Sequence, residues 1–311
     1  MRALIFALLV AACGASAPVE ETQEAAPPPA LAPSNIVAFF DCLQRDGGTI
    51  VAAHRGAPEP GYAENAIATF DHTFAQAPVA MEIDVTQTRD GALVLLHDET
   101  LDRTTTGSGD VGAITLAQFQ RLNLKDERGR TLEQHPATLR EALTWAAGKT
   151  ILELDIKQGV PFEAVIEEVR AANAENRVVL ITYSEGAAMR LHRIAPNLMI
   201  SAPIDSEADL DDLIARRADL TRFLAWTGIE EPNSALNVTL AQHGVETLFG
   251  TLGHPDRSWD ARIERGEASG YAAFAEAGVE LIASDNPVAA QRAIDASDGE
   301  GYRPLKCAGA N

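Results

Sequence analysis

Short apolar runs rich in Val, Ile and Leu alternate along the chain with segments of helical periodicity, and this alternation limits the possible folds more than any other feature. Strands that are separated by helices pair in parallel, because antiparallel neighbours need only a tight turn between them. The strands expected on this basis cover residues 49–53, 79–85, 151–156, 178–182, 198–202, 223–226, 246–250 and 279–283.

The segments between these strands place apolar residues on one helical face. In residues 65–76, for example, Ile67, Phe70 and Phe74 have the spacing of a single face. Strand-then-helix repeats of this number predict a (β/α)8 TIM barrel. A doubly wound open sheet is the alternative, but its Gly-x-Gly-x-x-Gly sequence is absent after the first strand. The other expected helices are 138–146, 162–173, 185–194, 207–216, 233–243, 269–276 and 288–294.

A further expected strand, residues 92–97, does not fit the alternation. It follows the strand 79–85 after Asp90-Gly91, a pair that favours a hairpin turn, so we expect it to be antiparallel at the rim of the barrel. Residues 98–130 come next and form a small insertion in an early β-to-α loop. Active sites of these barrels lie at the carboxyl ends of the strands, so the insertion should cover the site.

The first residues have the pattern of a bacterial export signal. The apolar run 3–12 is too short to span a bilayer and is typical of a signal peptide. Val10-Ala11-Ala12-Cys13 resembles a lipobox, so we predict a lipoprotein-type signal peptide over residues 1–12 and a lipid on Cys13. The protein would then be exported and anchored on the periplasmic side of the envelope membrane. Cleavage after Ala17, which would give a soluble periplasmic protein, is the alternative.

Residues 13–34 are rich in Ala, Pro and Glu and predict a flexible tether, because they hold few large apolar residues. The barrel domain should then cover residues 35–311. Cys42 and Cys307 lie near its two ends, which meet when a barrel closes. Paired cysteines of exported proteins usually form disulfides, so we predict a Cys42–Cys307 bond, with two free thiols as the alternative.

Acidic residues dominate the composition. The chain has 25 Lys and Arg residues and 45 Asp and Glu residues, a formal net charge of −20. Nucleic-acid binding needs many surface cations, so this charge excludes a general nucleic-acid-binding protein. An anionic substrate must be attracted locally, by a metal ion or a few basic side chains. We expect a monomer without a nucleic-acid partner.

Carboxylates occupy alternate positions on two of the expected strands. Glu82 and Asp84 share one face of the second strand, about 6.6 Å apart, and Glu153 and Asp155 repeat the pattern on the next barrel strand. Apolar residues flank them, so the charges need a partner or a cation. Oxygen ligands suit one divalent cation, Mg²⁺ or Ca²⁺, whereas zinc more often takes His or Cys. Ion pairs with Arg are the structural alternative.

Histidines and cationic side chains lie at the ends of the same strands. His54 and Arg55 end the first strand, His97 ends the rim strand, and Lys157 follows Asp155. Each of them could be structural when taken alone. Together they predict a phosphate-binding catalytic site beside the cation.

The order of these motifs is similar to that of a known family. The motifs are His54-Arg55-Gly56, Glu64-Asn65, Glu82-x-Asp84, Thr88-x-Asp90-Gly91, His97-Asp98, Leu101-x-Arg103-Thr104-Thr105, Pro136-x-Thr138-Leu139-x-Glu141, Asp155-x-Lys157 and Ala283-Ser284-Asp285-Asn286-Pro287. From about residue 49 to residue 287, the chain resembles the glycerophosphodiester phosphodiesterases, metal-dependent TIM barrels of the phospholipase C-like group.

The resemblance implies hydrolysis of a small-molecule phosphodiester to sn-glycerol 3-phosphate and an alcohol. It also implies a role for each site residue. Glu82, Asp84 and Asp155 would bind the metal, His54 and His97 would act as general acid and base, Arg55 and Lys157 would hold the phosphate, and Glu64 and Asn65 would support them.

Three positions depart from the family pattern. Asp155 stands where Glu is usual, and Glu153 could share or replace its role as a ligand. Ala63 replaces a Pro before the Glu-Asn pair. The segment 249–253, Phe-Gly-Thr-Leu-Gly, replaces the Trp-Thr-Val-Asn sequence that usually shapes the pocket for the leaving alcohol. Trp226 or Trp259 could supply the missing aromatic side chain.

Other functions remain open at this point. One is a phosphodiesterase like lysophospholipase D or sphingomyelinase D, which a large apolar groove beside the metal would favour. A small polar pocket would favour the glycerol diester. Another is a non-catalytic barrel that binds phosphodiester headgroups. A zinc amidohydrolase barrel is disfavoured because its usual His-x-His strand is missing.

Overall fold

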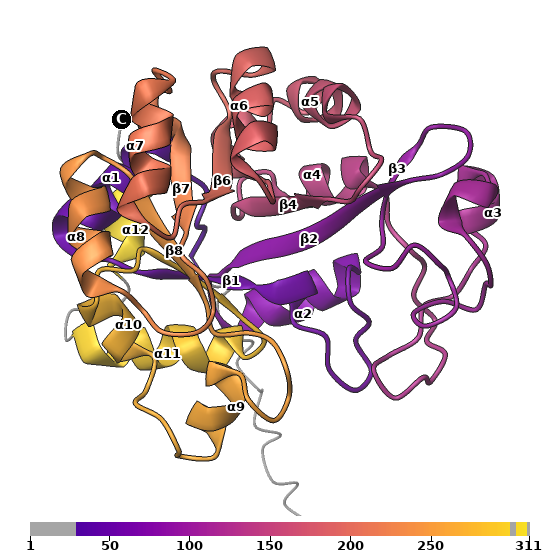
Figure 1. Ribbon diagram of the computed structural model, residues 1–311. Helices are drawn as coiled ribbons and strands as arrows, with labels where there is room; N and C mark the ends of the chain where they lie inside the picture. The colour runs from indigo at the N-terminus through magenta and orange to yellow at the C-terminus, as the bar shows by residue number, and fades with distance from the viewer. Residues whose placement is uncertain (1–28, 299–302, 310–311) are drawn as a thin grey trace, which may run out of the picture.

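The computed structural model describes residues 29–298 and 303–309, and its strands close into a barrel (Figure 1). Parallel strands follow one another in the order β1-β9-β8-β7-β6-β5-β4-β2, and β2 pairs back to β1. The rim strand β3 pairs antiparallel with β2. The predicted (β/α)8 barrel and its antiparallel rim strand are therefore confirmed. The strands are β1 Ile50–Ala53, β2 Ala80–Gln87, β3 Leu93–Leu95, β4 Leu152–Ile156, β5 Val178–Ile181, β6 Met199–Pro203, β7 Phe223–Trp226, β8 Glu246–Gly250 and β9 Leu281–Ser284.

Helices surround the barrel, and the expected ones are present within a few residues of their predicted ends. Four helices were not predicted: α1 and α12 at the two ends of the described chain, and the short α3 and α9 in loops. The helices are α1 Ile36–Asp46, α2 Ile67–Gln76, α3 Leu116–Phe119, α4 Leu139–Ala146, α5 Phe162–Ala171, α6 Glu185–Ile194, α7 Glu207–Ala215, α8 Ser234–Gln242, α9 Trp259–Glu264, α10 Ala272–Glu276, α11 Pro287–Asp298 and α12 Pro304–Cys307.

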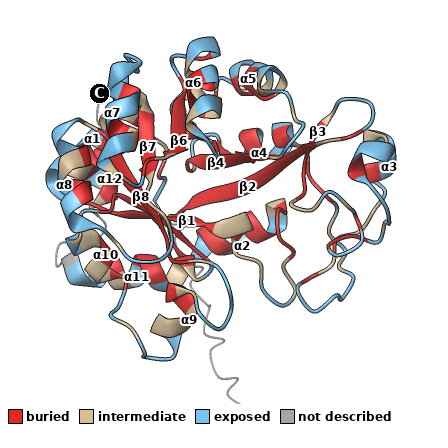
Figure 2. Ribbon diagram, viewed as in Figure 1, coloured by how far each residue is buried: buried red, intermediate tan, exposed pale blue. Residues whose placement is uncertain are grey.

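Two apolar layers hold the barrel together, because successive side chains of a strand point to opposite faces. Residues such as Val51 and Ile83 pack outward against the helices, whereas Ile50 and Leu224 point into the barrel. Figure 2 shows the buried strands at the centre and the exposed outer faces of the helices. Apolar side chains thus fill the interior of the barrel at one end, and the other end is left for a functional site.

Helix α1 closes the amino-terminal end of the barrel. Asn35 caps the helix by accepting hydrogen bonds from the amides of Val37 and Ala38. Phe39 and Phe40 are fully buried in the same apolar cluster as the inward-facing strand residues. Burial of one such side chain stabilises the fold by roughly 1.5–3 kcal/mol. The helix therefore acts as the plug of the barrel.

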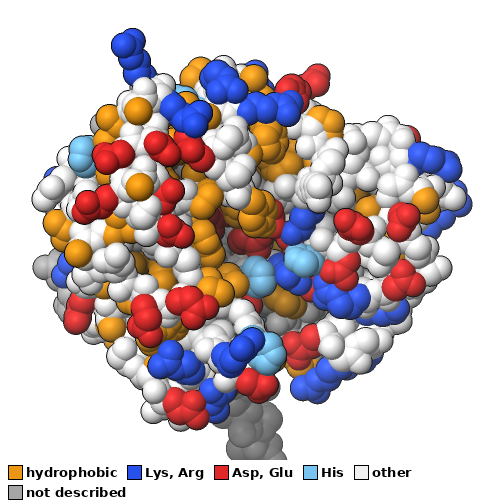
Figure 3. All heavy atoms as spheres, in the orientation of Figure 1, with side chains coloured by type: hydrophobic (Ala, Val, Ile, Leu, Met, Phe, Trp, Pro, Cys, Tyr) orange, Lys and Arg blue, Asp and Glu red, His pale blue; other side chains and the backbone are white. Residues whose placement is uncertain are grey.

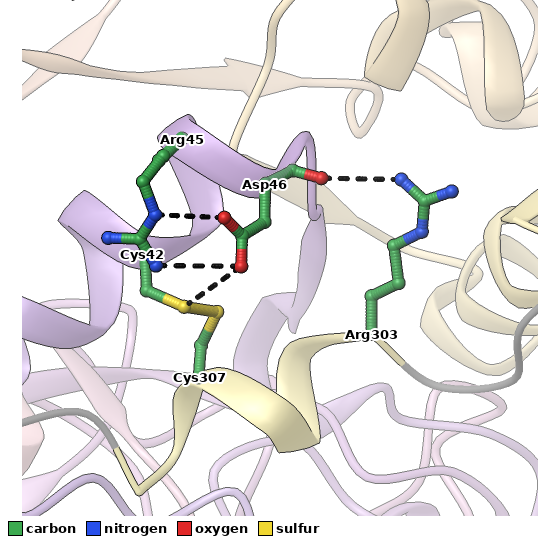
Figure 4. The surroundings of a disulfide bond; sticks show 5 residues. All are labelled: Cys42, Arg45, Asp46, Arg303 and Cys307. Atoms are coloured by element: carbon green, nitrogen blue, oxygen red, sulfur yellow. Dashed lines mark hydrogen bonds and ion pairs between the residues drawn. A yellow bond between two sulfur atoms is a disulfide. The ribbon is translucent and has the colours of Figure 1, made fainter.

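A disulfide joins the two ends of the domain, as predicted. Cys42 of α1 and Cys307 of α12 are bonded, with Cα atoms 5.6 Å apart (Figure 4). Arg303, just before α12, donates a hydrogen bond to the carbonyl of Asp46. Because the bond spans 265 positions, it removes much conformational freedom from the unfolded chain.

The folded domain begins before the predicted boundary at residue 35. Leu31 is fully buried under the barrel, and its amide donates a hydrogen bond to the carbonyl of Lys149. The predicted tether 13–34 is therefore too long at its carboxyl end. The predicted signal peptide 1–12, Cys13 and the rest of the tether up to residue 28 lie outside the described residues. Within the described part of the chain, no helix is long and apolar enough to span a membrane.

The loop between β3 and α4 folds into a small unit of its own. Leu101, Val111 and Phe119 are buried there together with Val94 and Leu96 of the rim strand region. This unit holds α3 and corresponds to the predicted insertion. It extends from the carboxyl end of β2 beside the barrel mouth (Figure 1).

Candidate active site

Three carboxylates meet inside the mouth of the barrel. The register of β2 and β4 pairs Glu82 with Glu153 and Asp84 with Asp155, so all four side chains point inward. Oxygen atoms of Glu82, Asp84 and Asp155 lie within 4.8 Å of one another, and the three residues are at most 7% exposed. The structure thus brings together the three residues that the sequence analysis predicted as metal ligands.

The charges of this cluster are only partly compensated. Burial raises the pKa of Glu82 well above its usual value, and the neighbouring Asp84 and Asp155 raise it further. Burial would also raise the pKa of Asp84, but Lys157, Asn65 and Arg55 hold it below the usual value. The Nζ atom of Lys157 lies 2.5 Å from Asp84 and 2.6 Å from Asp155. Like charges this close need cations around them.

The donor set fits a hard divalent cation. All three groups are carboxylates, and the buried Oδ1 atom of Asp155 has no hydrogen-bond partner within the described structure. Mg²⁺ and Ca²⁺ prefer such oxygen ligands. Because the three carboxylates lie on two adjacent strands, they could bind one ion together.

Glu153 lies beside this cluster but outside it. Its side chain is 1% exposed and its Oε1 atom has no partner within the described structure. Burial raises the pKa of Glu153 to about 8, so the side chain is mostly neutral at pH 7. Its oxygen atoms are not among those of Glu82, Asp84 and Asp155 that lie within 4.8 Å of one another. Asp155 is therefore the better candidate for the third ligand.

Strained backbone after β1 positions the second group of residues. Arg55 and Asn65 have φ values of 52° and 57°, which cost about 1–3 kcal/mol each in residues other than glycine. The amide of Arg55 donates to Glu82 at 2.7 Å, and Asn65 bonds both the side chain and the amide of Asp84. Gly56 has a φ of 81°, and a Cβ atom there would lie 2.5 Å from the ring of Phe70. The amide of Arg55 thus orients Glu82, and Asn65 of the later Glu-Asn pair orients Asp84.

Each predicted catalytic histidine is paired with an aspartate. The Nδ1 atom of His54 lies 2.7 Å from Asp285, and that of His97 lies 2.8 Å from Asp98. A carboxylate at Nδ1 favours a proton on that nitrogen and leaves Nε2 to exchange protons with a substrate. Burial would raise the pKa of Asp285, but its hydrogen bond with His54 keeps the pKa below the usual value.

An arginine of the insertion connects it to the mouth of the barrel. Arg103 donates paired hydrogen bonds to Glu64 and to Asp98 at 2.7–2.8 Å. Arg55 also contacts Glu64, at 3.3 Å. The pKa of Asp98 lies far below its usual value, mainly because Arg103 donates hydrogen bonds to its carboxylate. The supporting role predicted for Glu64 thus corresponds to an ion-pair network that fixes His97 through Asp98.

Sequence reasoning missed several members of the site. Asp98, Arg103 and Asp285 belong to the recognised motifs, but no role was inferred for them. Tyr183, at the end of β5, was missed entirely: its hydroxyl donates a hydrogen bond to Asp155 at 2.7 Å while the residue is 72% exposed. The only sequence signal for Tyr183 was its position just after an expected strand.

The two tryptophans proposed for the missing aromatic side chain differ in position. Trp259 is buried on α9, where it packs on Phe274 and donates a hydrogen bond to the carbonyl of Glu230. Trp226 ends β7 and packs with the inward-facing cluster. Figure 3 shows a hollow in this face, with Asp and Glu side chains at its floor, His, Lys and Arg along one side, and hydrophobic side chains along the other.

Known proteins resemble this chain in both sequence and fold. The sequence model of the glycerophosphoryl diester phosphodiesterase family matches residues 54–202. A glycerophosphodiester phosphodiesterase of Caldanaerobacter subterraneus is 34% identical over 160 residues, which cover 49% of this chain and 65% of that protein. One from Bacillus altitudinis is 27% identical over 164 residues, with coverages of 49% and 65%. The chain thus aligns with slightly less than two-thirds of each of these relatives.

Solved structures extend the similarity over most of the chain. A glycerophosphoryl diester phosphodiesterase from Parabacteroides distasonis has a TM-score of 0.76 and 30% identity, covering 86% of this chain and 94% of its own. A phosphodiesterase from Oleispira antarctica, solved with sn-glycerol-3-phosphate, shares the fold with a TM-score of 0.62 and 20% identity, with coverages of 81% and 99%. The fold and site define a TIM barrel with an acidic mouth. The chain belongs to the glycerophosphoryl diester phosphodiesterase family.

The roles of Asp155 and Glu153 can be separated by cation binding. We expect Asp155→Asn to weaken Mg²⁺ or Ca²⁺ binding by at least about tenfold, because it removes a ligand charge. Glu153→Gln should bind the ion as the wild type does, because Glu153 lies outside the cluster that Glu82, Asp84 and Asp155 form. Isothermal titration calorimetry measures both affinities, with circular dichroism to check folding. Equal losses in the two variants would contradict this assignment.

The contact between Asp285 and His54 predicts a specific tautomer. In the wild type, the proton of neutral His54 should lie on Nδ1, next to the carboxylate. In Asp285→Asn the amide can donate to Nδ1, so the proton should move to Nε2. Nitrogen-15 NMR of the histidine side chains distinguishes the two forms, with His54→Gln to assign the signal and His97 as the internal reference. An unchanged tautomer would show that Asp285 does not position His54.

Proposed function

We propose that the protein hydrolyses glycerophosphodiesters to sn-glycerol 3-phosphate and an alcohol, using one divalent cation, Mg²⁺ or Ca²⁺. The observation that carries the proposal is the meeting of three buried carboxylates with two His–Asp pairs at one barrel mouth. Family membership and the names of the relatives support the substrate class. A barrel that only bound headgroups would not need two histidines poised in this way.

The cation and two basic side chains would bind the phosphate and offset its negative charge. A cation held by Glu82, Asp84 and Asp155 would act as a Lewis acid at a phosphate oxygen. Lys157 keeps its positive charge at neutral pH: burial would lower its pKa, but Asp84 and Asp155 raise it. Arg55 lies 3.6 Å from Asp84. In this proposal both side chains bind phosphate oxygens and stabilise the charge that grows in the transition state.

The histidines would move the protons. One accepts a proton from the nucleophile, either water or the 2-hydroxyl of the substrate glycerol, and the other donates a proton to the departing alkoxide. Asp285 and Asp98 contact the two rings at their Nδ1 atoms, which supports each Nε2 as the atom that would exchange the proton. Because opposite protonation states are required, the rate should pass through a maximum with pH.

We also propose that the protein is exported and held at a membrane by a lipid on Cys13. The signal-like segment 1–12 supports this, and so does the Cys42–Cys307 disulfide, since such bonds persist in oxidising compartments. The acidic chain would then act on diesters on the periplasmic side of the envelope.

The activity can be tested with glycerophosphocholine as substrate. We expect release of sn-glycerol 3-phosphate that EDTA abolishes and that Mg²⁺ or Ca²⁺ restores. His54→Ala and His97→Ala should each lower kcat/KM by about 10²-fold or more, the usual contribution of a general acid or base. An enzyme-coupled assay for sn-glycerol 3-phosphate measures all of these rates.

His243→Ala is the matched control, because this exposed histidine follows α8 and takes no part in the site. It should keep the wild-type rate. Full activity in EDTA, or in either site variant, would contradict the mechanism. Binding of glycerophosphocholine without turnover would favour a headgroup-binding barrel instead.

A further inference from the structure

Asp260 is a buried carboxylate that the proposed mechanism does not use. It is the second residue of α9 and is 2% exposed. The hydroxyls of Tyr271 and Ser284 donate hydrogen bonds to its Oδ1 atom at 2.8 and 2.9 Å. The amide of Asp285 donates a hydrogen bond to its Oδ2 atom at 2.7 Å. Three donors therefore meet at one carboxylate, as the burial of such a polar group requires.

Asp260 joins the segments that follow two neighbouring barrel strands. Its own amide donates a hydrogen bond to the carbonyl of Thr251, just after β8, at 3.0 Å. Its carboxylate accepts from the amide of Asp285, just after β9. Because β8 and β9 pair side by side, this one residue of α9 fixes the ends of both strands relative to each other.

The residue that Asp260 holds is the partner of His54. The Oδ1 atom of Asp285 lies 2.7 Å from Nδ1 of His54, and its Oδ2 atom accepts a hydrogen bond from the amide of Gly253 at 3.0 Å. Gly253 has a φ of 135°, a conformation that residues with a side chain rarely adopt. Both carboxylate oxygens and the amide of Asp285 therefore have partners, and Asp260 is the partner of the amide.

Other residues already attach α9 to the barrel. The ring of Trp259 packs edge-on against Phe274. Ser258 caps the helix by accepting a hydrogen bond from the amide of Ala261. The carboxylate of Asp260 is therefore not needed to hold the helix in place. The shortest of its three hydrogen bonds comes instead from the residue that contacts the histidine.

We propose that Asp260 is a positioning residue for His54: it fixes Asp285, and Asp285 sets the tautomer and the orientation of the imidazole. The inference rests on the proposed function, because it assumes that His54 transfers a proton. Asp260 is buried and acts through Asp285 rather than on the substrate. Its loss should therefore lower kcat and leave KM near the wild-type value.

Kinetics with glycerophosphocholine and the metal-loaded protein test this role. We expect Asp260→Ala to lower kcat by roughly 10–100-fold, the usual cost of misplacing a catalytic group from outside the site. Asp260→Asn should keep most of the wild-type kcat. Its amide oxygen can accept from the amide of Asp285, and the hydroxyls of Tyr271 and Ser284 can accept from its NH2 group.

Nitrogen-15 NMR of His54 gives a second measurement that does not depend on turnover. In Asp260→Ala, the proton of neutral His54 should be distributed over Nδ1 and Nε2, because Asp285 is no longer fixed. In Asp260→Asn it should stay on Nδ1, as we expect for the wild type. His54→Gln assigns the signal.

Two further variants complete the design. Tyr271→Phe removes one donor to Asp260 and keeps the ring, so it tests the same contacts if Asp260→Ala does not fold. It should change kcat and the tautomer in the same direction, by a smaller amount. Asp256→Asn is the matched control, because it removes the same charge from a side chain that is 84% exposed before α9. It should leave kcat and the tautomer unchanged. Circular dichroism checks folding.

The outcomes separate this inference from the proposed function. A wild-type tautomer of His54 in folded Asp260→Ala, or in Tyr271→Phe if the alanine variant does not fold, would overturn the inference and leave the proposed function intact. Equal losses of kcat in Asp260→Ala and Asp260→Asn would also overturn it, because they would assign the effect to charge. A wild type that does not hydrolyse glycerophosphocholine would contradict the proposed function, and the NMR comparison would still decide whether Asp260 positions His54.

Discussion

Two neighbouring strands bring several carboxylates into one buried mouth, and the rest of the site must balance the repulsion among them. The register of β2 and β4 places Asp84 directly beside Asp155, and Glu82 lies close enough to share an ion with them. Such a cluster is unfavourable without positive charge. Lys157 and Arg55 supply part of it from the chain itself, and a divalent cation would supply the rest. Much of the loop structure around the mouth serves to hold these groups in place.

The fold could be predicted from the sequence because its signal is local and repeated. Alternating strands and helices define the barrel, and the two-residue period of Glu82-x-Asp84 and Glu153-x-Asp155 puts these side chains on one face. The disulfide followed from closure of the barrel. Helix α1 escaped prediction because it precedes the first strand and lies outside the repeat, so only its burial beneath the strands reveals it as a plug.

Long-range partners could not be predicted in the same way. His54 and Asp285 are 231 residues apart, and only the pairing of β1 with β9 brings them together. Tyr183 meets Asp155 across adjacent strands, and an aromatic residue after a strand carries no signal by itself. The choice between Glu153 and Asp155 depended on which carboxylate oxygen atoms meet in the barrel, which the spacing of two residues does not give. Likewise, only the fold shows that Trp226 packs with the inward-facing cluster whereas Trp259 packs on Phe274.

Crystals soaked in Mn²⁺, with diffraction data collected at the manganese absorption edge, test the central claim most directly. We predict one anomalous peak in the barrel mouth, within bonding distance of carboxylate oxygens from Glu82, Asp84 and Asp155, with the Lys157 ammonium displaced from between the two aspartates. A mouth without a peak at saturating Mn²⁺, or an ion that leaves out the carboxylates of either strand, would contradict it.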